Sequence, residues 1–221
     1  MHIKEIHDTI PAEIYSVLQK QGIEELRPSQ QKAIKHGLLD GKSLLVCTPT
    51  ASGKTLIAEL AGTKRLLTGK GKMVYIVPLK ALASEKYKEF KTKYDKLFTV
   101  ALSIGDKDAS DSYLADYDII LCTAEKLDSL LRHHCSWITQ VGTLIVDEIH
   151  LLNDASRGPT LEILITILRS LLKNVQLIAL SATIGNPKEL ADWLGATLVQ
   201  DTWRPVKLHK CVYHDGKVEF E

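Results

Sequence analysis

Residues 48–55 read Thr48-Pro49-Thr50-Ala51-Ser52-Gly53-Lys54-Thr55, and they lie between the apolar run 43–47 and a segment that favours a helix. A strand, a loop of small residues ending in Gly-Lys-Thr, and a helix are typical of a loop that binds the phosphates of a nucleoside triphosphate. Backbone N–H groups of such a loop point at the phosphates from the positive end of the helix. We expect Lys54 to reach the β- and γ-phosphates and the hydroxyl of Thr55 to bind Mg²⁺.

The loop departs from the usual G-x-x-x-x-G-K-[ST] pattern, because Thr48 stands where the first Gly is expected. Gly-Lys-Thr after a strand is short enough to arise by chance, and an ordinary strand-to-helix turn is therefore an alternative. The choice between the two depends on the rest of the chain.

Size and composition predict one large globular domain, residues 1–200. The chain has 221 residues, of which 45% are hydrophobic, enough for a sizeable core. Its formal net charge is +1, so overall charge gives no argument for binding nucleic acid or a membrane. Any contact with nucleic acid must come from local arrangement.

The cysteines and the N-terminus predict a cytoplasmic protein. Cys47, Cys122, Cys135 and Cys211 lie far apart without a C-x-x-C pair, which favours free thiols in a reducing compartment. The first ten residues carry several charges and do not resemble a signal peptide, and no window is apolar for the 18 or so residues that span a bilayer. We expect a monomer that does not enter a membrane.

Short runs rich in Val, Ile and Leu alternate with segments of helical period, as in βαβ units. We expect strands at 43–47, 73–77, 98–103, 118–122, 143–146, 176–180 and 197–199. We expect helices at 11–20, 28–39, 54–67, 79–94, 124–133, 159–172 and 187–194. The pattern predicts an α/β fold, a mostly parallel sheet with helices on both faces and ligands at the carboxyl ends of its strands. Residues 201–221, with an extended segment at 206–213, read as the start of a linker toward a further domain.

Asp147 and Glu148 end a buried strand and are followed by Ile149 and His150. In an enzyme with a phosphate-binding loop, an Asp at this place holds Mg²⁺ and a neighbouring Glu orients the attacking water. The alternative is a solvated pair of carboxylates, which becomes less convincing with Lys54 and Thr55 on a neighbouring strand. A zinc site is disfavoured because Glu148 and His150 lack the H-E-x-x-H spacing.

Two further segments border the predicted site. Ser181 and Thr183 follow the strand at 176–180, and their hydroxyls would either cap a turn or hydrogen-bond to Asp147 or His150. Gln30 precedes the loop by one helix, and a Gln amide matches the donor and acceptor on the N6/N7 edge of adenine. An ordinary turn residue is the alternative for Gln30.

These segments, in this order, resemble superfamily-two helicases, and residues 147–150 are similar to the DExH group. Gln30 matches the adenine motif of that family, residues 48–55 its Walker A loop, 147–150 its Walker B box and 181–183 its Ser-Ala-Thr motif. That family accepts a residue other than Gly at the first Walker A position, so the resemblance accounts for Thr48.

Residues 48–55, 78–86, 123–130 and 181–186 are most similar to the superkiller-type branch of these helicases. Within it they resemble the archaeal DNA repair helicases of the Holliday-junction migration type, akin to the helicase part of DNA polymerase theta. The resemblance runs from about residue 26 to 213 and covers the first of two RecA-like domains, with its adenine-motif helices at 11–40. It implies a RecA-like P-loop fold and a 3′-5′ DNA helicase that hydrolyses ATP and acts on forked or stalled replication structures.

The resemblance also implies roles for individual residues. Lys54 would neutralise phosphate charge, Thr55 and Asp147 would hold Mg²⁺, Glu148 would orient water, and His150 with Ser181 and Thr183 would couple hydrolysis to movement. Contacts to single-stranded or forked DNA would come from residues that the family motifs place at one edge: Pro78, Lys80, Gly105 with Asp106, Thr123 and Lys126. Phosphate oxygens accept from the N–H groups and hydroxyls there.

Two alternatives for the function remain open. An RNA helicase of the same branch shares these motifs, and a nucleotide-switched binding module would use the same loop without unwinding. The lysines at 86, 88, 91, 93 and 96 alternate with acidic residues, which favours a solvated helix face.

The second RecA-like domain would supply the arginines that complete hydrolysis, so we expect these 221 residues alone to hydrolyse ATP hardly at all.

Overall fold

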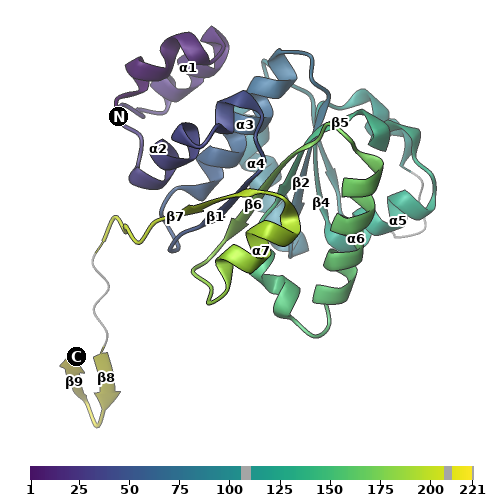
Figure 1. Ribbon diagram of the computed structural model, residues 1–221. Coiled ribbons are helices and arrows are strands. Elements are labelled where there is room, and N and C mark those ends of the chain that lie inside the picture. The colour runs from purple at the N-terminus through teal and green to yellow at the C-terminus, as the bar shows by residue number, and fades with distance from the viewer. Residues whose placement is uncertain (106–110, 207–210, 221) are drawn as a thin grey trace.

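The computed structural model describes residues 1–105, 111–206 and 211–220, and its centre is a seven-stranded sheet (Figure 1). The strands are ordered β3-β4-β2-β5-β6-β1-β7, and every pairing among them is parallel. Their bounds are β1 Leu44–Cys47, β2 Lys72–Val77, β3 Val100–Ser103, β4 Ile119–Thr123, β5 Val141–Val146, β6 Gln176–Ser181 and β7 Thr197–Gln200. This confirms the predicted α/β class, and the fold is RecA-like.

Helices cover both faces of the sheet (Figure 1). They are α1 Ala12–Lys20, α2 Pro28–Lys35, α3 Lys54–Leu67, α4 Lys80–Tyr94, α5 Ala124–Arg132, α6 Gly158–Leu171 and α7 Pro187–Leu194. Side chains alternate along each strand, so Tyr75 of β2 faces the core under α1, α3 and α4, whereas Val74 and Ile76 face the core under α5, α6 and α7. Both faces of every central strand are therefore buried, as the uninterrupted apolar runs predicted.

The predicted strands and helices agree with the structure to within a few residues, with one instructive difference. The helix expected at 28–39 ends at Lys35, because Gly37 adopts the left-handed conformation with φ +91°. A short 3₁₀ helix, Leu38–Asp40, then leads into β1. Another 3₁₀ helix, Ile3–Thr9, begins the chain and buries Ile3 and Ile6.

The sheet contains an irregularity where β2 and β5 begin. Lys72 pairs with Val141 and Met73 pairs with Thr143, so Gly142 is an extra residue without a partner. A Cβ atom on Gly142 would lie 1.6 Å from the carbonyl oxygen of Lys70. Only glycine lets the two backbones approach this closely.

After β7 the chain leaves the sheet. Residues 207–210, within the extended segment expected at 206–213, lie outside the described residues. Cys211–His214 and Lys217–Phe220 form β8 and β9, a separate two-stranded antiparallel sheet. Among the helices that the structure describes, none has the length and apolarity needed to cross a membrane.

Candidate nucleotide-binding site

The predicted phosphate loop lies at the carboxyl edge of the sheet, between β1 and α3. Cys47, the last residue of β1, pairs in register with Ser181 at the end of β6. The N–H of Thr48 donates to the carbonyl of Ser181 at 3.2 Å. Parallel pairing therefore brings the loop after β1 and the Ser-Ala-Thr segment together, although they are 133 residues apart in sequence (181 − 48).

Two hydroxyls close the loop across its base. The Oγ1 atom of Thr48 lies 2.7 Å from the Oγ atom of Ser52, and both side chains are buried. Thr48 thus makes a contact that a glycine at the same position would lack. Gly53 adopts φ +88°, and a Cβ atom on it would lie 2.5 Å from Nε2 of Gln30. The second glycine of the motif is therefore required by both backbone conformation and space.

Lys54 begins α3 and turns its side chain back into the loop. Its Nζ donates to the carbonyl of Thr48 at 3.0 Å. Burial lowers the pKa of Lys54, and the nearby carboxylates of Glu148 and Asp147 oppose this change. The ammonium group of Lys54 is therefore close enough to interact electrostatically with Asp147 and Glu148. The phosphate loop and these two carboxylates thus form one site.

Asp147 is fixed by two hydrogen bonds at the end of β5. Its Oδ2 accepts from the phenol of Tyr75 at 3.0 Å, and its Oδ1 accepts from the N–H of Glu148 at 3.0 Å. Burial and the charge of Asp147 raise the pKa of Tyr75 well above its ordinary value, so this phenol remains a donor. Tyr75 was not among the predicted site residues, and its period-2 position on β2, next to β5, is the signal that points to it.

Glu148 sits in a strained turn directly after the strand, with φ +49°. Its Oε2 lies 3.4 Å from Nδ1 of His150. The N–H of Ala182 points at the same nitrogen, also at 3.4 Å. Nδ1 accepts from Ala182 when it is unprotonated and donates to Glu148 when it is protonated, so the two contacts belong to different protonation forms of the ring.

The contact between the Ser-Ala-Thr segment and His150 is thus made by backbone, not by the hydroxyls named in the sequence analysis. Thr183 is exposed, and the buried Oγ of Ser181 has no hydrogen-bond partner within the described part of the chain. The sequence pattern located this segment correctly at the sheet edge, but it does not specify which atom faces the histidine.

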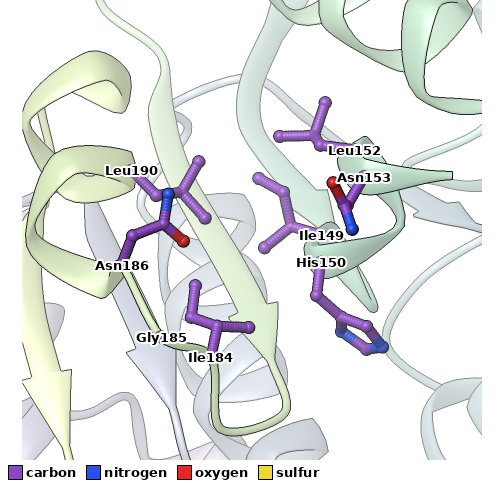
Figure 2. Close-up of a pocket in the computed structure, with 8 residues that line it drawn as sticks. All are labelled: Ile149, His150, Leu152, Asn153, Ile184, Gly185, Asn186 and Leu190. Carbon is purple, nitrogen blue, oxygen red and sulfur yellow. The ribbon is translucent and has the colours of Figure 1, made fainter.

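A pocket of about 530 Å³ lies beside His150. It lies between the 3₁₀ helix Ile149–Asn153 and the turn that leads into α7 (Figure 2). Ile149 and Leu190 face each other across it, whereas the ring of His150 points away from the other lining side chains (Figure 2). The pocket is lined by apolar side chains such as Ile149 and Leu190 and by polar ones such as Asn153 and Asn186, and it adjoins His150 rather than the phosphate loop.

Gln30 lies against the loop, and its amide is already used by the protein. Its Nε2 donates to the carbonyl of Gly53 at 3.0 Å, and its Oε1 accepts from the N–H of Arg27 at 2.8 Å. Ser29 donates to the carbonyl of Ser52 at 3.3 Å. A cavity of about 620 Å³, lined in part by Arg27, Gln30 and Gly53, opens on this side of the loop.

The residues after β7 also reach this region. The guanidinium of Arg27 donates to the carbonyl of Ala51 at 2.6 Å and lies 5.7 Å from the ring centroid of Trp203. The carboxylate of Asp201 forms an ion pair with Lys32 of α2 at 2.9 Å. The guanidinium of Arg27 therefore stacks over the indole of Trp203.

The predicted nucleic-acid residues divide into two groups. Lys80 and Gly105 are exposed at the same sheet edge, and Pro78 is partly exposed between β2 and α4; Asp106 lies outside the described residues. Thr123 and Lys126 are buried. Thr123 caps α5 by accepting from the N–H of Lys126 at 3.4 Å.

The ammonium of Lys126 forms an ion pair with Asp111 at 3.0 Å. Asp111 also accepts from the hydroxyl of Ser103, the last residue of β3, at 2.9 Å. Lys126 therefore ties α5 to the end of β3 instead of facing solvent.

The lysines of α4 are not one solvated face. Lys88 and Lys91 are exposed, as expected, and so is Lys96, which follows the helix. Lys86 and Lys93, however, are largely covered, with side chains 14% and 19% exposed. Their ammonium groups point toward α3, where Glu59 is buried. The alternating charge pattern alone does not reveal this, because it depends on how α4 packs against α3.

The oxygen donors of the site suit Mg²⁺. Mg²⁺ is typically bound by one or two carboxylates or hydroxyls together with phosphate oxygens and water, rather than by a full cage of protein ligands. The hydroxyl of Thr55 and the carboxylate of Asp147 supply donors of this kind, and Tyr75 fixes the orientation of the carboxylate. The residues present therefore fit the ion.

Comparison with known proteins gives one family. Residues 27–190 match the model of the DEAD/DEAH box helicase family. The chain is 53% identical over 221 residues to the ATP-dependent DNA helicase Hel308 of Pyrococcus horikoshii and 56% identical over 214 residues to that of Methanocaldococcus jannaschii. It covers 30% and 18% of the lengths of these relatives.

Solved structures show the same likeness at lower identity. The crystal structure of the DUF1998 helicase MrfA bound to DNA has a TM-score of 0.74 and 28% identity, and the match covers 88% of this chain and 30% of that one. The structure of MrfA bound to DNA and AMPPNP also gives a TM-score of 0.74, with 87% and 29% of the two chains covered.

Proposed function

Because the chain belongs to the DEAD/DEAH box helicase family, we propose that it is the ATP-binding domain of an ATP-dependent 3′-5′ DNA helicase acting on forked or stalled replication structures. One observation carries the proposal: the partly buried ammonium of Lys54 lies within the loop, in electrostatic reach of Asp147 and Glu148. This is the arrangement that phosphoryl transfer to water requires. The relatives named as DNA helicases support DNA as the substrate.

In this proposal the residues of the chain divide the work. Lys54 leaves the carbonyl of Thr48 and offers its charge to the phosphates, while loop N–H groups bind their oxygens. Glu148 orients the attacking water and accepts its proton at a carboxylate oxygen. Thr55 and Asp147 would hold Mg²⁺, which neutralises charge that develops on the phosphate oxygens. Nδ1 of His150 lies 3.4 Å from both the carboxylate of Glu148 and the N–H of Ala182, so His150 links the two segments.

We assign the adenine to the cavity beside Gln30. Binding there requires the amide of Gln30 to exchange one of its protein hydrogen bonds for the base, or to use its second N–H and second lone pair. In both cases Gln30 would connect the bound adenine to Gly53 of the phosphate loop through its hydrogen bonds. A Gln30→Ala variant should bind ATP and GTP with similar affinity, while the original chain prefers ATP.

The nucleic-acid contacts are proposed at the exposed edge formed by Pro78, Lys80 and Gly105. Exposed N–H groups and a lysine at the start of α4 bind phosphate oxygens without reading bases. A second RecA-like domain of the same polypeptide would face this edge and supply the missing arginines. The chain covers less than a third of its relatives, which leaves room for such a domain.

Replacing Glu148 with Gln in the complete protein tests the proposed hydrolysis. ATP binding should persist, while ATP hydrolysis and DNA unwinding should fall by about 10²-fold or more. Partner binding that continues to switch with ATP, without any unwinding by the original protein, would favour a nucleotide-switched module instead. Competition between DNA and RNA strands in the unwinding assay separates the DNA helicase from an RNA helicase of the same branch.

A further inference from the structure

Lys86 of α4 contacts the residue that is expected to bind Mg²⁺. Its Nζ donates to the hydroxyl oxygen of Thr55 at 3.2 Å. The two residues come from different helices, and the Lys86 side chain is only 14% exposed. No motif discussed above includes a role for this lysine, and its spacing in sequence had suggested a solvated position.

The contact belongs to a network of four alternating charges. Lys86 pairs with Glu89 at 2.8 Å, Glu89 lies 3.7 Å from Lys93, and Lys93 pairs with Glu59 at 2.8 Å. The phenol of Tyr94 also donates to Glu59 at 2.8 Å. Lys93 remains next to both glutamates if the charge of Lys86 is removed. The network therefore holds Lys86 in place, and the buried carboxylate of Glu59 keeps Lys93 as its counterion when the charge of Lys86 is removed.

The chemistry of Thr55 makes this contact consequential. A hydroxyl has one hydrogen to donate and two lone pairs, whereas an ammonium group only donates. Lys86 therefore occupies a lone pair of the same oxygen that a divalent cation would use. Two positive charges on one oxygen repel each other strongly where water is partly excluded. Lys86 and the cation thus compete for Thr55.

From this geometry we propose that Lys86 is a positioning residue for the reaction: it holds the hydroxyl of Thr55 and yields that oxygen to the nucleotide-bound cation. The inference rests on the proposed ATP site. Glu89, which lies one turn further along α4, keeps the released ammonium group in place. Lys86 therefore sets how much Mg²⁺ is needed before the nucleotide binds tightly.

The test measures binding of a fluorescent ATP analogue to the full chain while Mg²⁺ is titrated. Lys86→Met keeps the length and apolar stem of the side chain but removes the charge. We expect the Mg²⁺ concentration for half-maximal analogue binding to fall by about threefold to tenfold. Lys88→Met, an exposed lysine of the same helix, is the matched control and should leave the Mg²⁺ titration unchanged. Lys86→Arg should restore the original Mg²⁺ requirement.

Each other outcome has a definite meaning. The same Mg²⁺ titration for Lys86→Met and Lys88→Met would overturn the inference, and so would weak binding by Lys86→Met at saturating Mg²⁺, which would make Lys86 a phosphate ligand. Thermal unfolding of each variant shows whether its fold is intact. If the original chain binds no analogue at any Mg²⁺ concentration, the proposed function itself fails, and that result is distinct from failure of the inference.

Discussion

Replacing Tyr75 with Phe removes one oxygen atom from the site and should separate stability from cation binding. The phenol of Tyr75 is buried and donates to Asp147 at 3.0 Å. Losing a hydrogen bond to a charged group costs about 1.5–3 kcal/mol of unfolding free energy. For a chain of this size, that corresponds to a melting temperature lower by about 3–12 °C. Among the described residues, Asp147 then keeps its bond from the N–H of Glu148, so its carboxylate is held less firmly.

Tyr94→Phe is the matched control, because the phenol of Tyr94 also donates to a carboxylate, that of buried Glu59, at 2.8 Å. Both variants should lose similar stability in thermal or urea unfolding. Only Tyr75→Phe should also weaken binding of a fluorescent ATP analogue in the presence of Mg²⁺, by about tenfold or more, as expected for loss of a residue that orients a metal ligand. Equal analogue affinity in the two variants would refute the role assigned to Tyr75.

The remaining predictions concern three other positions. Gly53→Ala places a Cβ atom on a residue with φ +88° and 2.5 Å from Nε2 of Gln30. It should abolish ATP binding and lower the unfolding free energy by about 1–3 kcal/mol. An alanine variant that binds ATP normally would contradict the loop geometry. Gly142→Ala drives a Cβ atom into the carbonyl of Lys70, and urea unfolding should show that the unfolding free energy falls by about 3 kcal/mol. Gly185→Ala is the control, because no atom lies within 4 Å of the added Cβ, and it should change stability little. Burial raises the pKa of Glu59, so this carboxyl favours the folded state while it is protonated and that contribution disappears as the pH rises through the raised pKa. Glu59→Gln should therefore gain stability relative to the original chain as the pH rises above about 4.5, and a difference that does not change with pH would exclude this account.

Repeating apolar runs were sufficient to predict the sheet and its helices. Each central strand is buried on both faces, and such strands are uninterrupted runs of Val, Ile and Leu that are easy to find. The same reasoning placed Lys54, Asp147 and Ser181 at one edge, because carboxyl ends of parallel strands share an edge. Element boundaries depend on single residues, as the left-handed Gly37 shows at the end of α2.

The side-chain contacts of the site were harder to predict than its location. Lys126 and Lys80 are both lysines near strand ends, yet one is buried against Asp111 and the other is exposed. Which of them reaches solvent depends on where the chain places Asp111 relative to α5, and local spacing does not encode this. Tyr75 and Lys86 were missed for the same reason, since their partners lie 72 and 31 residues away.

Trp203 links the chain beyond β7 to the phosphate loop through side-chain contacts as well as through the sheet. Beyond β7, the backbone is fastened to α2 through Asp201 and Lys32, and the indole of Trp203 lies against Arg27, which holds the carbonyl of Ala51. Tension on the chain beyond residue 203 would therefore act on α2 through Asp201 and on the phosphate loop through Trp203 and Arg27, in addition to β7 itself.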